Sequence, residues 1–182
     1  MSAVLSVAAG LALAAAAGFR AFVPLLAAGL AIQFGYLEPA AGFAWLGDPL
    51  VIIALATATA VEVAAYYVPG LDHLLDAIAA PVAVAAGIVA AAGVMAELPD
   101  WLRWLAAIAG GGSLTALTHA ANALGRVKTG ASTAGTGNPL YATGELASAA
   151  LIAGIAVLLP LVALVALAIA LIVLWRRQRR AA

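Results

Sequence analysis

The fold is decided by the stretch VLSVAAGLALAAAAGFRAFVPLLAAGLAIQF, residues 4–34, in which Arg20 is the single ionisable side chain. A helix of about 20 mostly apolar residues crosses the roughly 30 Å of hydrocarbon in a bilayer, because every backbone hydrogen bond closes inside the segment. At about 1.5 Å per residue, a straight helix over this stretch would be about 46 Å long. The stretch therefore indicates a membrane segment that tilts or breaks.

Pro24 predicts where the first stretch breaks. Proline has no N–H to donate to the carbonyl of Arg20, and its ring clashes with that carbonyl. We expect a kink near Arg20 and a single crossing by the whole stretch. A hairpin at Arg20 would instead make two crossings and bring the N-terminus to the cytoplasmic side.

The composition excludes a water-soluble globule. Of the 182 residues, 66% are hydrophobic and 9% are charged, and the mean hydropathy is +1.15. A soluble domain carries about 25% charged residues, because its surface faces water. The chain has no room for a soluble domain between its five apolar stretches, which are residues 4–34, 49–67, 74–95, 102–124 and 146–175.

These stretches predict an all-α fold, a polytopic transmembrane helical bundle of about five membrane helices with the first helix broken near residues 20–24. We expect one transmembrane domain, residues 1–175, and a basic tail, residues 176–182. Pro160 predicts a kink in the last stretch as well. Alanine-rich runs and the glycine triplet at residues 110–112 offer smooth surfaces for close packing, which predicts a tight bundle and a homo-oligomer.

The basic tail orients the chain. Its four arginines leave residues 1–175 with four basic and eight acidic side chains. Because Lys and Arg are retained on the cytoplasmic side of a membrane, we expect a cytoplasmic C-terminus. The body offers no basic stripe, so nucleic acid is not an expected partner. The absence of cysteine excludes disulfides, thiolate metal sites and cysteine nucleophiles.

Three ionisable residues expected at membrane depth are the informative ones, namely Arg20, Glu62 and His119. A charge at the bilayer centre costs about 2.5–3.5 kcal/mol on insertion scales. Arg20 cannot lose its proton, so it needs a carboxylate, freed carbonyls or water. Glu62 is its expected partner. Such a pair either fixes the register of the helices or forms part of a site for a solute or an ion.

Further polar residues are expected to face the same interior. Tyr66 follows Glu62 by four residues and shares its helix face. Polar side chains also recur at helical spacing on the fourth stretch, which indicates a stripe that packs on other helices or lines a water-accessible path. The stripe comprises Thr115, Thr118, His119, Asn122 and Arg126.

The segment of residues 125–145 is rich in Gly, Thr and Ser. Its glycines would allow backbone amides to converge on an anion, but it lacks the ending of a nucleotide-binding P-loop. Two interpretations stay open, an exposed loop or a re-entrant segment that lines a cavity with Thr136 and Asn138. Thr143 would cap the last helix, and Glu145 would lie in its first turn.

Asp72, His73 and Asp76 are the candidates for a metal site, because two carboxylates and an imidazole could hold a divalent cation. Their spacing does not match a strong metal signature. Asp72 serves equally well as the N-cap of the third helix. We therefore expect no metal and no cofactor.

Four motifs stand out along the chain: GFRAFVP at residues 18–24, Glu62 followed by PGLD at 69–72, IAGGG at 108–112, and TGNP at 136–139 with Glu145. On these motifs the chain resembles a family of bacterial integral membrane proteins, the domain-of-unknown-function family numbered 4126. The resemblance implies a multi-helix protein of the bacterial inner membrane and implies no particular activity. The motifs fall on the polar positions described above, which favours one shared site.

These residues predict a small channel or transporter in the lipid bilayer, with an internal polar cavity for a solute or an ion. Two alternatives stay open. One is an enzyme that modifies lipid headgroups, with His119 as acid or base. An enzymatic activity is less favoured than transport. The other is a structural subunit that stabilises a partner. The residues expected to line the cavity are Arg20, Glu62, Tyr66, His119, Asn122, Arg126, Thr136, Asn138 and Glu145.

Overall fold

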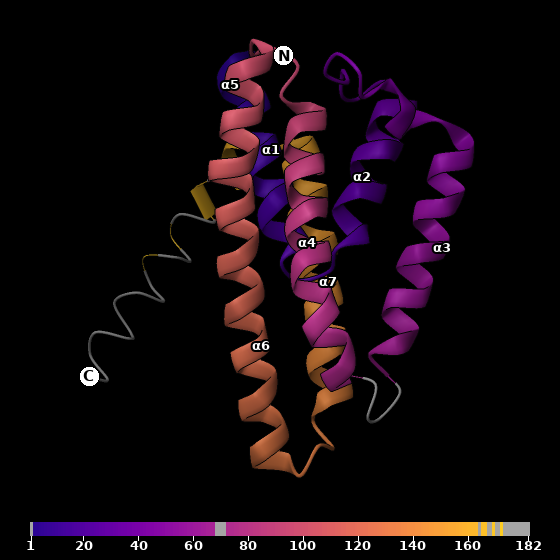
Figure 1. Ribbon diagram of the computed structural model, residues 1–182, viewed down its shortest axis with the longest axis vertical. Helices are drawn as coiled ribbons and strands as arrows, with labels where there is room; N and C mark the ends of the chain where they lie inside the picture. The colour runs from indigo at the N-terminus through magenta and orange to yellow at the C-terminus, as the bar shows by residue number, and fades with distance from the viewer. Residues whose placement is uncertain (1, 68–71, 164, 167–168, 170–171, 173–182) are drawn as a thin grey trace.

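The computed structural model describes residues 2–67, 72–163, 165–166, 169 and 172, with side chains left out at 72–77 (Figure 1). The described residues contain seven α-helices and no strand, so the predicted all-α class is confirmed. The helices are α1 (Ala3–Ala17), α2 (Phe22–Gln33), α3 (Pro49–Ala65), α4 (Asp72–Val94), α5 (Asp100–Leu105), α6 (Ser113–Thr133) and α7 (Asn138–Leu158).

The first apolar stretch folds as a hairpin of two short helices. In Figure 1, α1 runs from the N-terminus into the bundle, the chain turns through residues 18–21, and α2 returns to the end where α1 began. Packing contacts agree. Gly10 of α1 lies against Met95, and Ala40, which follows α2, donates its N–H to the carbonyl of Gly93 at 2.8 Å, so both lie beside the end of α4. We call residues 18–21 the hairpin tip.

The predicted kink, after which the chain would continue in the same direction, is therefore wrong. Pro24 does not interrupt a helix, because it lies in the first turn of α2, where a missing N–H breaks no helical hydrogen bond. The chain leaves helical geometry earlier, after Ala17, and Gly18 closes α1 with its N–H on the carbonyls of Ala15 and Ala16. The break was predicted at the right place, but the chain reverses there.

α1 forms the centre of the bundle. It packs against α4, α6 and α7, and ten of its fifteen residues are buried, most of them alanine or glycine. α4 runs alongside it, and α5, a π-helical segment (Ala106–Gly112) and α6 follow one another as one long helix. α3 lies at the periphery and has no buried residue. The core therefore lies around the hairpin.

Glycines allow the close approach at the centre. A Cβ on Gly111 would lie 3.1 Å from Cβ of Ala91 and 3.3 Å from Cβ of Ala14. Such distances are tighter than nine in ten real Cβ contacts, so with a larger residue here α1 and α4 would have to shift by a few tenths of an ångström. The packing role predicted for the glycine triplet is confirmed at this position.

The segment of residues 125–145 is not an exposed loop, so that interpretation is wrong. It is largely helical, and Asn138 lines a cavity as the other interpretation predicts. α6 continues to Thr133, a turn follows through Ala134 and Gly135 at positive φ, and α7 begins at Asn138. The glycines serve the packing of α6 on α7, because a Cβ on Gly130 would lie 3.3 Å from Oδ1 of Asn138.

The start predicted for the last helix is also wrong. Thr143 lies inside α7 and donates to the carbonyl of Pro139 at 2.9 Å, so it does not cap the helix. Glu145 consequently lies two turns into α7.

The predicted break at Pro160 is confirmed. α7 ends at Leu158, Leu159 has φ −139° and ψ 66°, and residues 160–163 are helical again. Trp175 and the basic tail lie outside the described residues. Among the described helices, α7 is the one long and apolar enough to cross a membrane, and α1, α2, α3 and the segment Ile78–Val94 of α4 are apolar but shorter.

Candidate functional site

The carbonyl groups at the end of α1 are bound by polar side chains of α6. Thr115 donates to the carbonyl of Ala14 at 2.6 Å, and Thr118 donates to Ala15 at 3.1 Å. The side-chain amide of Asn122 donates to the carbonyl of Gly18 at 3.3 Å. The last carbonyls of a helix have no partner within the helix, so these contacts satisfy groups that the break sets free. The buried stripe of α6 thus holds the first half of the hairpin.

The amides at the start of α2 are bound by Glu62 of α3. Its Oε1 accepts from the backbone N–H of Ala21 at 2.8 Å, and its Oε2 accepts from Phe22 at 3.2 Å. A carboxylate at this place satisfies two free donors and complements the positive end of the helix dipole. Glu62 therefore acts as a cap delivered from another helix.

The ion pair of Arg20 is with Glu145, so the expected pairing with Glu62 is wrong. Nη2 of Arg20 lies 3.2 Å from Oε2 of Glu145 and donates to the carbonyl of Ala142 at 3.1 Å. The reason is geometric, because the free amides of α2 take up the carboxylate of Glu62. The guanidinium group of Arg20 contacts α7 instead of α3.

Arg126 binds the same carboxylate. Its Nη2 lies 2.6 Å from Oε1 of Glu145. The ring of Tyr66 lies against both arginines, with its centroid 4.0 Å from Cζ of Arg20 and 4.5 Å from Cζ of Arg126. All four residues are buried. We call Arg20, Tyr66, Arg126 and Glu145 the ionic cluster.

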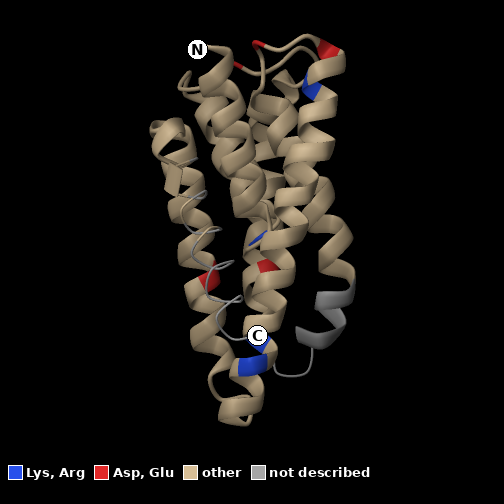
Figure 2. Cartoon of the chain, turned by 90° about the vertical axis from the view of Figure 1, so that its left-hand side faces the viewer, with Lys and Arg blue, Asp and Glu red and all other residues tan. Residues whose placement is uncertain are grey.

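The ionic cluster joins the hairpin tip to three other helices, because Tyr66 follows α3, Arg126 lies on α6 and Glu145 lies on α7. Arg20 is 1% exposed, and its Nε and Nη1 have no hydrogen-bond partner among the described residues. Glu62 brings a second carboxylate to the tip, so the charges of two arginines and two glutamates balance. In Figure 2, acidic segments gather at one end of the bundle and few charged residues lie between the ends.

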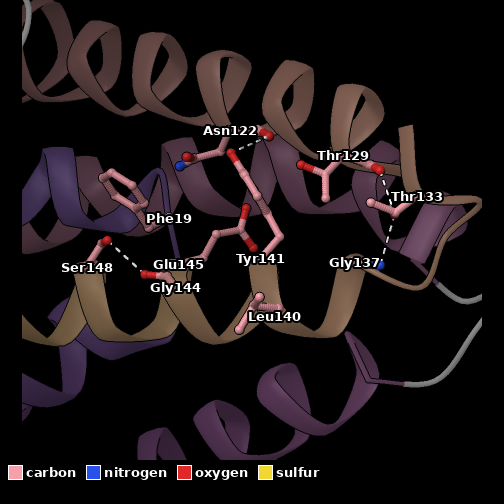
Figure 3. Close-up of a pocket in the computed structure, with 10 residues that line it drawn as sticks. All are labelled: Phe19, Asn122, Thr129, Thr133, Gly137, Leu140, Tyr141, Gly144, Glu145 and Ser148. Carbon is pink, nitrogen blue, oxygen red and sulfur yellow. Dashed lines mark hydrogen bonds between the residues drawn. The ribbon is translucent and has the colours of Figure 1, made fainter. Parts of the chain in front are cut away.

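An open groove of about 510 Å³ adjoins the ionic cluster. It lies between α6 and α7 and extends from Thr133 and Gly137, at the turn joining these helices, to Phe19 at the hairpin tip (Figure 3). Glu145 is the one charged residue among those that line it. We call it the α6–α7 groove. From Asn122 to Thr133 it follows about 16 Å of α6.

The structure brings six of the nine expected site residues to the hairpin tip. Four form the ionic cluster, and Glu62 and Asn122 bind the backbone beside it. Asn138 lines a second cavity, of about 290 Å³, together with Arg126. Thr136 lies in the exposed turn, where its hydroxyl donates to the carbonyl of Thr133 at 2.8 Å.

His119 does not face the ionic cluster. It is half-buried and lines an apolar groove with Pro81 and Ile88 on the side of α4. Thr115, Thr118, Asn122 and Arg126 define the buried stripe, and His119 lies at its edge. The expectation that His119 shares the stripe is therefore wrong.

The side chains of Asp72, His73 and Asp76 lie outside the described part of the chain. Within the part that the structure describes, no three His, Cys, Asp or Glu side chains come together as a metal site would require.

Sequence reasoning missed several groove residues, chiefly Thr129, Tyr141 and Ser148. Tyr141, Glu145 and Ser148 follow one another at spacings of four and three, which places them on one face of a helix. This spacing indicates a shared face only if the segment is helical, and the sequence did not identify it as helical.

The fold and the site define a class of all-helical protein in which a broken helical hairpin carries a buried ionic cluster at its tip. The family described as a domain of unknown function (DUF4126) matches residues 7–180, and the chain belongs to this family. No curated protein and no solved structure matches the chain significantly.

Proposed function

We propose that the protein is a multi-pass protein of the bacterial inner membrane that moves a small solute through the α6–α7 groove. The observation that carries the proposal is the groove itself, which leads from one end of the bundle to a buried helix break lined with charge. Three further observations support it.

The exterior of the bundle suits lipid. α3 is apolar and has no buried residue, and Leu50, Ile53 and Val61 on it are more than 60% exposed. Large exposed side chains also lie along α4, α6 and α7. In water such a continuous apolar surface would promote association, whereas in a bilayer it faces a matching solvent.

The lengths of the two helices of the hairpin are consistent with a re-entrant membrane segment. With 15 and 12 residues, α1 and α2 are about 22 and 18 Å long, short of the roughly 30 Å hydrocarbon core. Non-helical backbone at membrane depth is tolerated where it is buried in protein or lines a cavity. Transporters place discontinuous helices of this kind at their binding sites. The tip would therefore lie near the middle of the membrane, at the inner end of the groove.

The charges suit an orientation with the turn between α6 and α7 on the cytoplasmic side. Lys128 is exposed near that turn, whereas Glu38, Asp48, Glu97 and Asp100 are exposed at the other end of the bundle. Retention of basic residues in the cytoplasm favours this arrangement, with α3, α4, α5 to α6, and α7 as crossings. A homo-oligomer stays a prediction from the sequence.

Filling the α6–α7 groove should stop solute movement. Gly144 lines the groove and a Cβ there would meet no atom within 4 Å, so Gly144→Phe should place its ring in the groove without strain. We expect solute flux in proteoliposomes to fall at least tenfold. Gly154→Phe is the matched control, because Gly154 lies on the same helix, has equally open space and does not line the groove.

Equal flux through both variants would contradict a path through this groove. It would favour the second candidate function, a structural subunit, which is supported by one observation: the described polar groups of the tip are largely bound within the protein. The headgroup-modifying enzyme has less support, because His119 faces an apolar groove away from the arginines.

A further inference from the structure

We infer that the α6–α7 groove selects small uncharged solutes rich in hydrogen-bond donors, such as polyols. The inference rests on the proposed function and names the substrate class of that same site. It follows from three properties of the groove: which hydrogen-bonding atoms face it, how its charge is balanced, and how large it is.

The hydroxyl groups of the groove donate to the backbone. Thr129 donates to the carbonyl of Gly125 at 3.0 Å, and Ser148 donates to Gly144 at 2.8 Å. Tyr141 donates to the carbonyl of Asn122 at 3.3 Å, as Figure 3 shows. Each hydroxyl has one hydrogen and two lone pairs, so these groups meet a ligand as acceptors.

The remaining polar side chains of the groove extend this pattern. Thr133 donates to the carbonyl of Thr129 at 2.7 Å and accepts from the backbone N–H of Gly137 at 2.9 Å. One of the two amide hydrogens of Asn122 is bound by the carbonyl of Gly18 at 3.3 Å. The carboxylate of Glu145 carries no hydrogen to donate. Acceptors therefore outnumber donors among the polar atoms that the groove offers, which favours a solute with N–H or O–H donors of its own.

The charge balance disfavours an ion. Glu145 is the one charged residue that lines the groove, and it is already bound by Arg20 and Arg126. With Glu62 at the tip, the charges of this region sum to zero. A buried ion without a partner of opposite charge pays a large desolvation penalty, so an added cation or anion has no counter-charge here.

The dimensions suit a small organic molecule. The volume of about 510 Å³ lies in the usual range for ligand sites and far exceeds that of a bare ion. Phe19 and Leu140 supply an apolar wall against which a carbon skeleton can lie. Acceptors together with apolar surface match a polyol.

A flux assay on the full-length protein in proteoliposomes tests the solute class. Erythritol serves as the uncharged probe, and glycerol 3-phosphate and protonated ethanolamine serve as the charged ones, each corrected for protein-free liposomes. We expect erythritol to move at least tenfold faster than either ion. An equal or faster rate for either ion would overturn the inference and leave the proposed function standing. Absence of flux for all three probes would overturn both.

A double variant, Thr129→Val with Ser148→Ala, tests the acceptors. It removes two oxygen atoms from the groove at similar side-chain volume, and we expect erythritol flux to fall about tenfold with unchanged thermal unfolding. Thr57→Val is the control, because Thr57 bonds its own helix in the same way, to Ile53, and lies exposed on α3. Wild-type erythritol flux in the double variant would overturn the role of these acceptors, whereas loss in Gly144→Phe alone would still support the path.

Discussion

Glu145→Ala is expected to lower the free energy of unfolding by about 3–5 kcal/mol, because it removes the carboxylate that two buried arginines share. Arg20 would lose its ion pair while 1% exposed, and it has few other polar contacts among the described residues. Denaturant titration of the purified protein in detergent measures the change. The exposed Glu38 supplies the control, since Glu38→Ala should change stability by less than about 0.5 kcal/mol.

Replacing the three charged residues of the ionic cluster with apolar ones separates their effect on stability from their effect on function. Arg20→Met, Arg126→Leu and Glu145→Leu together leave no unpaired charge among these three positions, and such replacements are often neutral or stabilising. We expect the triple variant to recover most of the stability lost in Glu145→Ala but to lack solute flux. Full flux in a stable triple variant would refute a functional role for the ionic cluster.

Gly18→Leu is expected to destabilise the protein by about 3 kcal/mol or more. A Cβ on Gly18 would lie 2.8 Å from the backbone nitrogen of His119 and 2.7 Å from Cβ of Thr118. These atoms belong to the backbone and the base of a side chain, so they cannot move away without separating α1 from α6. The same denaturant titration measures the loss.

Gly154→Leu provides the comparison, because a Cβ there would meet no atom within 4 Å. Leucine is also the better helix former, so this variant should be unchanged or more stable by up to about 1 kcal/mol. If Gly18→Leu were as stable as Gly154→Leu, the hairpin tip could not rest on α6 as described.

The positions of the breaks could be predicted from the sequence, but the direction of the chain after the first break could not. The first and last apolar stretches are too long for one straight crossing, and each contains a proline. These two features indicate that a helix ends near Arg20 and before Pro160. Whether the chain bends or reverses at the first break depends on tertiary contacts. Glu62 binds the amides of α2, and α6 binds the carbonyls of α1, and neither contact leaves a local signal in residues 4–34.

The candidate site could be predicted in part. Arg20, Glu62 and Arg126 stand out because charge is rare in this chain, and the structure brings them to one place. The partner of Arg20 was missed because the glycines of residues 125–145 resemble loop residues. In a tightly packed pair of helices they instead allow close approach, as at Gly125 against Tyr141. His119 was misplaced because helical spacing alone does not decide which edge of a stripe is buried.

The proposed re-entrant hairpin would place the N-terminus and residue 41 on the same side of the membrane. The chain has no cysteine, so single variants can be labelled with a membrane-impermeant maleimide in sealed vesicles before and after permeabilisation. Ser2→Cys, Ala41→Cys and Ser132→Cys all use exposed positions. We predict that the first two label from the same side and the third from the opposite side. Labelling of positions 2 and 41 from opposite sides would mean that the first stretch crosses the membrane once, and would contradict the hairpin.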